Sequence, residues 1–319
     1  MIPSFHSPKV FAITLNWNGK ADTVECIASL KKSDYPNIEI IIVDNGSTDG
    51  SVSAIRTEFP DIIIVENQRN LGYAKGFNRG IEHAYERAAD YFLILNNDTS
   101  IDPAAITELV KIAERDENIG FVTGKVFWYT HRDVFQTIGR FDEPSLLIGD
   151  HVGSGEVDRG QYDDIQDFNF VDDVFLLVRK KVFEVVGGYD PVFFLYYEET
   201  DWCARTRRAG FRIVYTPQAK IWHKGQIGKS EKLLSPKRTF YLSRYEVPFM
   251  RRNASRPQWR AYLIRLILGS DRIFLRHMKH GRYKWAWAYL KGLCLGFFWL
   301  RHDIRITAPI SRPANTVEG

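Results

Sequence analysis

Residues 38–58 read IEIIIVDNGSTDGSVSAIRTE, and this stretch indicates how the first half of the chain folds. Ile38–Val43 is mostly apolar and β-branched, which is typical of a buried strand. The strand stops at Asp44, and the Asn, Gly and Ser residues that follow are those that form turns. Asp49–Glu58 then has the spacing of a short helix. A strand, a polar turn and a helix in this order predict one unit of an α/β fold.

The same alternation continues on either side of this unit. Strands and helices are predicted in turn at Val10–Leu15, Ala21–Lys31, Ile62–Glu66, Gly76–Ala88 and Tyr91–Leu95, and Pro103 stands where a further helix begins. Strands separated by helices predict crossover connections and a mainly parallel sheet. In such sheets ligands bind beyond the carboxyl ends of the strands, so we expect a binding site at that edge.

The pattern is less regular in the middle of the chain. Residues 139–173 are rich in Gly and Asp and have little periodicity, so we expect a long loop that is either functional or mobile. Phe175–Val178 returns to strand character, Glu198–Ala209 is predicted as a helix, and Arg212–Tyr215 is predicted as the last strand. The chain beyond Pro236 is expected to be mainly helical.

Charge is distributed unevenly along the 319 residues. The net charge is +4, but the chain from Pro236 onward carries 17 Lys and Arg against 4 Asp and Glu, whereas the first 235 residues carry 26 against 35. We therefore divide the chain into an acidic body, residues 1–235, and a basic, aromatic-rich helical extension, residues 236–319. Tryptophans beside basic residues favour contact with a membrane surface. The alternative is an extension packed on the body with a solvated basic face.

Neither nucleic acid nor a secretory route is expected. No nucleic-acid-binding module accompanies the basic charge. The three cysteines have no metal-ligand or redox spacing, which is typical of free thiols in a reducing compartment, and the first residues do not form a secretory signal. Trp285–Leu300, the longest apolar stretch, is interrupted by Lys291 and is shorter than the roughly 20 residues of a membrane span. We expect a cytoplasmic protein, peripheral on the cytoplasmic membrane face if the extension binds lipid.

Polar clusters directly follow the predicted strands. Asn16, Asp44 and the triplet Asn96-Asn97-Asp98 each stand at a strand end, where amides and carboxylates can bind a nucleotide or a hard divalent cation with a diphosphate. Each cluster alone is also explained by turns and helix caps. Three glycines spaced by four residues, within 72–80, permit either the close approach of a phosphate or tight packing of a helix on the sheet.

A further acidic cluster, Glu198, Glu199 and Asp201, follows an aromatic run. Acidic residues suit the first turn of a helix because of its macrodipole. Partial burial of such a cluster also raises a carboxyl pKa, which suits a general base. His223 follows the last strand, where a single histidine is usually structural but is also a common ligand.

Together these clusters resemble family 2 of the inverting glycosyltransferases, in particular its bacterial rhamnosyltransferase-like branch. The matching segments occur in the family's order within residues 8–250, and they are TLNWNG (14–19), IVDNGSTDGS (42–51), NLGYAKGFNRG (70–80), ILNNDT (94–99), VGGYDPVFFLYYEETDWCAR (186–205) and IWHKG (221–225). The resemblance implies the GT-A fold, a Rossmann-like, mainly parallel mixed sheet flanked by helices, for the body. The helical extension follows it.

The resemblance also implies a role for each matched position. Asp98 and His223 are implied as ligands of a divalent metal, Mg²⁺ or Mn²⁺. Glu199 matches the catalytic base with Glu198 beside it, and Asp201 is implied to support the helix start or the acceptor. Donor contacts are implied at Thr14, Asn16, Asp44, Gly46, Asn70, Gly72, Gly76, Asn78, Asn96 and Asn97.

Two positions depart from the family pattern. Asn96 stands where the metal-binding motif usually has its first carboxylate, and because an amide brings no charge we expect weaker metal binding. Asp172 and Asp173 stand where the family often has a small Ser-Gly pair. We place the acceptor side at these two residues and Trp202, and we expect that side to differ from other members.

We therefore predict an inverting glycosyltransferase that moves a hexose or deoxyhexose, with rhamnose favoured by the resemblance. The donor is a dTDP- or UDP-linked sugar, and the acceptor is a hydroxyl of a glycan or lipid-linked molecule. Two alternatives stay open. A nucleotidyltransferase would carry a basic, Gly-rich loop after the first strand, and Asn16-Trp17-Asn18-Gly19 is not such a loop. A non-catalytic sugar- or lipid-binding module would not need carboxylates at both Asp98 and Glu199.

Overall fold

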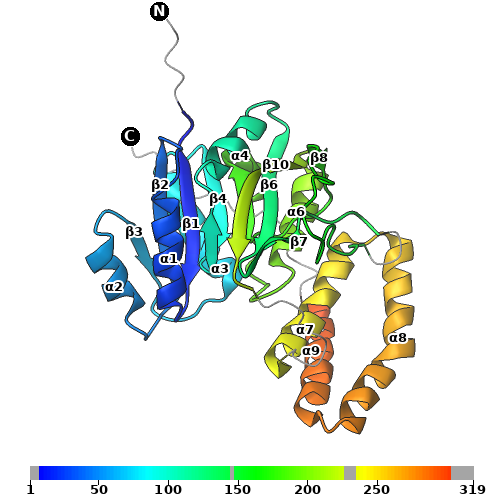
Figure 1. Ribbon diagram of the computed structural model, residues 1–319. Coiled ribbons are helices and arrows are strands. Elements are labelled where there is room, and N and C mark those ends of the chain that lie inside the picture. Colours follow the sequence, from blue (N-terminus) through cyan, green and yellow to red (C-terminus); the bar gives the residue numbers. More distant parts are fainter. Residues whose placement is uncertain (1–6, 144–146, 226–234, 303–319) are drawn as a thin grey trace, which may run out of the picture.

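The computed structural model describes residues 7–143, 147–225 and 235–302, and it is built around one ten-stranded sheet (Figure 1). The strand order is β3-β2-β1-β4-β9-β6-β10-β5, with β7 paired to β6 and β8 paired to β10. The strands are β1 (Val10–Asn16), β2 (Ile38–Asp44), β3 (Ile63–Glu66), β4 (Tyr91–Asn96), β5 (Thr99–Ile101), β6 (Ile119–Trp128), β7 (His131–Thr137), β8 (Gln166–Asp167), β9 (Phe175–Arg179) and β10 (Arg212–His223).

Helices cover both faces of the sheet because successive residues of a strand point to opposite sides. Phe11 and Ile13 of β1 belong to one core, with α3, α5 and α6, while Val10 and Ala12 belong to the other, with α1, α2 and α4. The helices are α1 (Lys20–Leu30), α2 (Ser51–Glu58), α3 (Tyr73–Glu86), α4 (Ala105–Ala113), α5 (Lys180–Val186), α6 (Glu198–Arg208), α7 (Pro236–Asn253), α8 (Arg256–Lys279) and α9 (Tyr283–His302).

Parallel and antiparallel pairs occupy different parts of the sheet. β3, β2, β1 and β4 pair in parallel, as crossover units require. β9 then pairs antiparallel with β4 and β6, and β10 lies parallel to β6. The predicted α/β fold with a mixed sheet is confirmed, and its parallel half brings the carboxyl ends of β1, β2 and β4 to one edge.

β10 is longer than its sequence pattern indicates. The sequence predicts that the last strand ends at Tyr215, but β10 continues to His223. A register shift just after Tyr215 takes Pro217 out of the ladder with β6. Gly124 of β6 makes room there, because a Cβ on it would lie 2.2 Å from the carbonyl oxygen of Ala219. The longer strand is what carries His223 to the edge of the sheet.

The described part of the extension is helical, as predicted. α7 and α9 lie side by side in Figure 1, and α8 runs separately before it joins α9 through a turn at Gly281. Gly292 and Gly296 let α9 approach closely, because a Cβ on either would collide with α7. The division at residues 235 and 236 stays a prediction, and residues 303–319 lie outside the described residues.

Aromatic contacts attach α7 to the segment that precedes α6. Three rings of residues 193–197 each contact a ring of α7, with centroids 5.2 to 5.6 Å apart, in the pairs Phe193 with Tyr245, Phe194 with Tyr241 and Tyr197 with Phe249. The segment that leads into α6 is therefore packed against α7 of the extension. Within the described chain, none of the helices combines the length and the apolar character needed to cross a membrane.

Candidate active site

A chain of side-chain hydrogen bonds links the carboxyl ends of β1, β2 and β4. Asn97 donates to the Thr23 hydroxyl (2.9 Å), which donates to Asn16 Oδ1 (2.9 Å). The Asn16 amide in turn donates to Asp44 Oδ1 (2.8 Å). Asp44 Oδ2 accepts from two backbone N–H groups of the turn that follows. These bonds fix the side chains, and since each carboxylate oxygen can accept more than one bond, Asp44 keeps capacity for a ligand hydroxyl.

Asn45 holds the loop that precedes α3. Its amide group donates to Asn70 Oδ1 (3.1 Å) and to the Gly72 carbonyl (3.2 Å). Gly46 has a φ of +77°, and a Cβ there would lie 2.7 Å from the backbone of Arg69. The left-handed backbone and the close approach both require glycine. The structure thus brings three predicted donor positions, Gly46, Asn70 and Gly72, beside the end of β2.

Gly76 and Asn78, which the resemblance implies as donor contacts, make packing contacts in the structure. α3 begins at Tyr73, three residues before the predicted start, so Gly76 lies inside the helix. A Cβ on Gly76 would lie 2.6 Å from the Leu15 side chain, which explains the residue by packing of the helix on the sheet. Asn78 uses both ends of its amide on the backbone of Tyr189, donating to the carbonyl (2.8 Å) and accepting from the N–H (2.9 Å).

Asp98 and His223 meet because β5 pairs antiparallel with β10. Asp98 Oδ1 lies 3.0 Å from His223 Nε2. The other ring nitrogen, Nδ1, lies 2.7 Å from Gln136 Oε1, to which it donates. Burial by itself raises the pKa of Asp98, but the hydrogen bond and the charge of His223 lower it below its usual value. An ionised carboxylate and an oriented imidazole therefore stand together, as the sequence predicts.

A divalent cation fits this pair as part of a larger set of ligands. Gln136 orients the imidazole through its second nitrogen, an arrangement common to metal-binding histidines. Asn96 adds no anionic oxygen because its side chain is an amide. Its Oδ1 already accepts a hydrogen bond from the Tyr73 hydroxyl (3.0 Å). Among the described residues, no cluster of three or more His, Cys, Asp or Glu side chains could hold a metal ion. Two protein ligands would leave the other coordination positions to water and to phosphate oxygens of a substrate.

The turn before α6 sets the direction of its first residues. Tyr196 and Tyr197 both have left-handed backbone, with φ angles of +73° and +69°. Such a conformation costs about 1–3 kcal/mol for each residue that is not glycine, and it persists where the surrounding structure enforces it. Here the ring contacts with α7 enforce it. The turn places Glu198 and Glu199 in the first turn of α6.

Four carboxylates gather in front of β9 and α6, and they are Asp172, Asp173, Glu198 and Glu199. One guanidinium serves two of them, since Arg140 Nη2 lies 3.0 Å from Asp172 and 3.6 Å from Glu199. His151 Nδ1 lies 3.0 Å from the other oxygen of Asp172. Tyr189 donates to Asp173 (2.7 Å). The cluster joins the two aspartates, which we placed on the acceptor side, to the predicted catalytic glutamates.

The carboxylates of this cluster differ in charge at neutral pH. Burial, helped by the charge of Glu199, raises the pKa of Asp173 to about 8. Burial and the charges of Glu199 and Asp173 raise the pKa of Glu198 well above its usual value. Burial would do the same to Asp172, but Arg140 and His151 bring its pKa below the usual range. Burial therefore favours the protonated forms of Glu198 and Asp173, while Arg140 and His151 favour the ionised form of Asp172.

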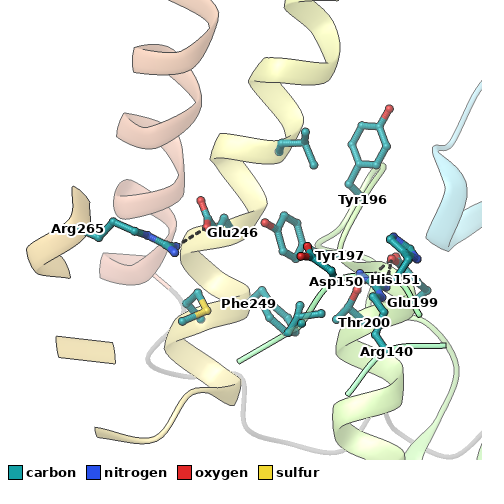
Figure 2. Close-up of a pocket in the computed structure, with 14 residues that line it drawn as sticks. Arg140, Asp150, His151, Tyr196, Tyr197, Glu199, Thr200, Glu246, Phe249 and Arg265 are labelled. Carbon is teal, nitrogen blue, oxygen red and sulfur yellow. Dashed lines mark hydrogen bonds and ion pairs between the residues drawn. The ribbon is translucent and has the colours of Figure 1, made fainter. Parts of the chain in front are cut away.

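Two pockets meet at Glu199. The strand-end pocket, of about 430 Å³, is lined by residues that include Asn96, Gln136 and Glu198. The helix pocket, of about 370 Å³, lies between the start of α6 and the helices α7 and α8 (Figure 2). His151, Tyr196 and Glu199 line both pockets. Glu199 is therefore the one predicted catalytic carboxylate that can reach molecules in both.

The predicted site residues that lie in the protein interior include Trp202, Asp201 and Thr14. Trp202, which we placed on the acceptor side, is wholly buried and donates to the Gly187 carbonyl (2.9 Å), so it cannot contact an acceptor. Asp201 is buried and pairs with Arg205 one turn along α6 (2.6 Å), which supports the helix. Thr14 is buried in β1, and its hydroxyl has no hydrogen-bond partner among the described residues.

Several pocket residues carry no recognisable signal in the sequence. Gln136, Arg140 and His151 come from β7 and the irregular segment after it, and only the tertiary fold brings them to the site. Arg238 lines the strand-end pocket from the first turn of α7. Tyr73 stands inside a quoted motif, and its hydroxyl bond to Asn96 is the one contact that a closer reading of that motif could have suggested.

The sequence is similar to those of known glycosyltransferases. A model of the family described as Glycosyl transferase family 2 matches residues 11–187. The chain is 28% identical over 218 residues to the N-acetylglucosaminyl-diphospho-decaprenol L-rhamnosyltransferase of Mycobacterium tuberculosis, covering 62% of this chain and 70% of that protein. It is 30% identical over 203 residues to the poly-beta-1,6-N-acetyl-D-glucosamine synthase of Staphylococcus aureus, covering 63% of this chain but only 45% of that protein.

Solved structures share the fold. The mannosyltransferase PcManGT from Pyrobaculum calidifontis, in complex with GDP-Man and Mn²⁺, superposes with a TM-score of 0.58 at 14% identity, over 92% of this chain and 88% of that chain. GalNAc-T7 with UDP, GalNAc and Mn²⁺ gives a TM-score of 0.57 at 15% identity, over 81% and 52%. At these identities the likeness concerns the fold, and it confirms the predicted GT-A architecture.

Proposed function

The chain belongs to glycosyl transferase family 2 and is therefore a glycosyltransferase, and we propose that it moves a hexose or deoxyhexose from a nucleoside-diphosphate sugar to an acceptor hydroxyl, with inversion at the anomeric carbon. The observation that carries this proposal is the position of Glu199, which lines both pockets. The similarity to an L-rhamnosyltransferase favours a rhamnose-like sugar carried by dTDP or UDP.

In this proposal the donor extends along the strand ends into the strand-end pocket. Asp44 and Asn70 meet the nucleoside, with Asp44 held in place by the buried Asn16, and the free lone pairs of Asp44 accept from a ribose hydroxyl. Burial favours the protonated forms of Asp173 and Glu198, and a protonated carboxyl can donate a hydrogen bond to a sugar oxygen, which an ionised carboxylate cannot do. In support, Glu198 Oε2 is buried and has no hydrogen-bond partner among the described residues.

Asp98 and His223 would hold a divalent ion beside the diphosphate. When bound, such an ion supplies Lewis-acid stabilisation of the charge on the diphosphate, an effect of several kcal/mol. Arg238 lines the same pocket and adds a positive charge for the leaving group. The two fold relatives were solved with Mn²⁺ and with a nucleotide or nucleotide sugar, which supports Mn²⁺ or Mg²⁺ as the ion.

Glu199 acts as the general base. It takes the proton of the acceptor hydroxyl while that oxygen forms a bond to the anomeric carbon. The bond from this carbon to the diphosphate oxygen breaks, and its electron pair leaves with the nucleoside diphosphate. Attack from the opposite face inverts the configuration. Arg140 and Thr200, whose hydroxyl donates to Glu199 Oε1 (3.0 Å), fix the carboxylate for this transfer.

The helix pocket receives the acceptor. It offers the rings of Tyr196, Tyr197 and Phe249 together with the polar groups of Glu246 and Arg265 (Figure 2). Aromatic faces and a few convergent polar groups are what a sugar requires, and about 370 Å³ lies in the usual range of ligand pockets, roughly 300–1,000 Å³. The acceptor side therefore moves from Trp202 to α7 and α8.

A lipid-linked acceptor fits this placement. The Mycobacterium tuberculosis relative is named for an acceptor sugar joined through diphosphate to decaprenol, and such a lipid is anchored in a membrane. By analogy, the proposal places this protein at the cytoplasmic face of a membrane, with the acceptor sugar in the helix pocket and its lipid outside it.

The test is a donor screen followed by transfer. Thermal shift with dTDP-, UDP- and GDP-linked sugars, in Mn²⁺ or in EDTA, identifies the donor, and transfer is then followed on a short-chain polyprenyl-diphospho-N-acetylglucosamine. We expect one nucleotide class to stabilise the protein, more strongly with Mn²⁺, and NMR to show a product of inverted configuration. Retained configuration would contradict the mechanism. Release of pyrophosphate from a nucleoside triphosphate and a sugar phosphate would point to nucleotidyl transfer.

A further inference from the structure

The helices α8 and α9 expose an unusual amount of apolar side chain. Among the described residues, nine large apolar side chains of these two helices are exposed, against five in the rest of the chain. Ile267 is 76% exposed and Trp287 is 64% exposed. Exposed apolar side chains scattered singly need no explanation, but a concentration on one part of the surface marks a site of interaction.

On α8 these side chains form a stripe. Ile264, Ile267, Leu268 and Leu275 are spaced by three, four and eleven residues from the first, so they share one side of the helix. The opposite side of α8 includes the buried Tyr262 and packs toward the rest of the molecule. The stripe therefore faces away from the protein.

The exposed face of α9 continues the same surface. Tyr283 and Trp287 are one turn apart, and Phe298 lies on the same side further along the helix. The rings of Trp287 and Phe274 are in edge-on contact, with centroids 6.0 Å apart. Because Phe274 belongs to α8, this contact joins the two exposed faces near the turn between the helices.

Positive charge surrounds this apolar surface. Residues 256–299 carry nine Lys and Arg and one acidic residue, Asp271, which gives a net charge of +8. Arg265 of α8 pairs with Glu246 of α7 at the helix pocket. The partner of this surface must therefore be both apolar and negatively charged.

We propose that the exposed faces of α8 and α9 dock on an anionic lipid bilayer. Apolar side chains enter the boundary between headgroups and acyl chains, Tyr and Trp rings suit the headgroup level, and Lys and Arg meet anionic headgroups. A second copy of the chain is a poorer occupant, because two surfaces of +8 repel each other.

The position of this docking surface relative to the helix pocket gives it a role. Arg265 of α8 lines the helix pocket, and its neighbour Ile264 belongs to the exposed stripe. Docking would thus bring the pocket to the membrane surface, within reach of a sugar carried on a lipid. This role rests on the proposed function, whereas the docking itself does not.

Vesicle flotation tests the proposal on the full chain, without any sugar nucleotide. We expect binding to phosphatidylcholine vesicles that contain phosphatidylglycerol, little binding to phosphatidylcholine alone, and a loss of binding at high salt. The double variant Ile267→Ser with Leu268→Ser should bind roughly tenfold more weakly or worse. The double variant Arg272→Gln with Lys279→Gln should lose about fivefold for each charge.

Control variants change exposed apolar and charged residues outside α8 and α9, to show that any loss of binding is specific to this surface. Val185→Ser changes an exposed apolar residue of α5, and Lys32→Gln with Arg115→Gln changes exposed charges of the body, so these variants should bind as the wild type does. All variants should transfer sugar equally well to a water-soluble acceptor, which distinguishes failed docking from failed catalysis. If circular dichroism shows a melting shift in the first variant, Ile264→Ser with Leu275→Ser tests the same stripe.

Three results would overturn the proposal. The first is equal binding to neutral and anionic vesicles, and the second is unchanged binding of the stripe variants. The third is a wild-type dimer, seen by light scattering, that the Ile267→Ser, Leu268→Ser variant converts to a monomer, because that result would assign the surface to a second copy.

Discussion

The strand ends and the carboxylate cluster lie on two sides of one site and are built on opposite principles. At the strand ends, Asn97, Thr23, Asn16 and Asp44 form an unbroken chain of hydrogen bonds. In the cluster, burial raises the pKa of Asp173 to about 8, and Arg140 Nε has no hydrogen-bond partner among the described residues. The side chains of the strand-end chain have hydrogen-bond partners before a ligand binds, whereas groups of the carboxylate cluster do not.

The difference indicates how the work is divided. A network whose side chains are already fixed by hydrogen bonds positions a nucleotide at little further cost. A buried cluster of carboxylates is unfavourable by itself, and groups with displaced pKa values are characteristic of sites where protons are moved or held. We therefore assign recognition of the nucleotide to the strand ends and the chemistry to the cluster.

The largest effect is expected at the base. Glu199→Gln keeps the shape of the side chain but removes its proton acceptor, so kcat should fall about 10³-fold, within the range for general base catalysis. The Kd of the donor, measured by calorimetry, should stay close to that of the wild type. Glu198→Gln is the matched control, and it should cost much less because Glu198 lines the strand-end pocket but not the helix pocket, where the acceptor is placed. Equal losses in the two variants would contradict the assignment.

The next effect concerns the diphosphate. Asp98→Ala removes the one carboxylate beside His223, and it should weaken nucleoside-diphosphate binding in Mn²⁺ roughly a hundredfold, since a bound ion contributes several kcal/mol. In EDTA the variant and the wild type should bind equally. Asp133→Ala, on the exposed part of β7, serves as the control. The metal role would be lost if calorimetry gave the same Mn²⁺ dependence for all three proteins.

Substitutions in the two regions should also lower the free energy of unfolding by different amounts. Arg140→Met leaves Asp172 buried without its guanidinium and should lower the free energy of unfolding by about 3–5 kcal/mol. Asn16→Ala breaks single hydrogen bonds at the strand ends but leaves no ion pair broken, so it should cost only about 1–3 kcal/mol. Urea unfolding at neutral pH measures both. A smaller loss for the Arg140 variant would show that the cluster is not held by charge.

The smallest effect is a dependence of stability on pH. The folded-state pKa of Asp173 is about 8, above the unfolded value of about 3.9. The folded state therefore binds more protons between these values, and stability should fall as the pH rises from 4 to 8. Asp173→Asn should flatten that slope, so the melting temperatures of the variant and the wild type should diverge across this range. Parallel melting curves would argue against a protonated Asp173.

Local sequence was enough to predict the strand ends. The stretch 38–58 contains the strand, the turn and the helix that place Asp44, and Asn16 and Asn96 end their own strands in the same way. Side chains at the ends of parallel strands meet because the sheet brings them together, so a pattern of short segments predicts the contact. Gly76 and Asn78 show the limit of this reasoning, because the same motif also serves helix packing.

The cluster could not be predicted in the same way. Arg140 and His151 come from an irregular segment whose sequence has no periodicity, and their partner Asp172 lies at its far end. Trp202 matched the family pattern yet lies in the core, since one side of α6 must pack on the sheet. β10 continues beyond Pro217, where the sequence predicts its end, because of a register shift that requires Gly124 of β6. These features depend on tertiary contacts that no single segment encodes.

The most direct test of the central claim is a measurement of the two Michaelis constants in two variants. Asp44→Asn alters the strand ends, and Phe249→Ala opens the helix pocket on the other side of Glu199. We predict that Asp44→Asn raises the KM of the donor and leaves that of the acceptor unchanged, while Phe249→Ala does the reverse. If either variant raised both constants to the same extent, the two pockets would not divide donor from acceptor, and the account would be contradicted.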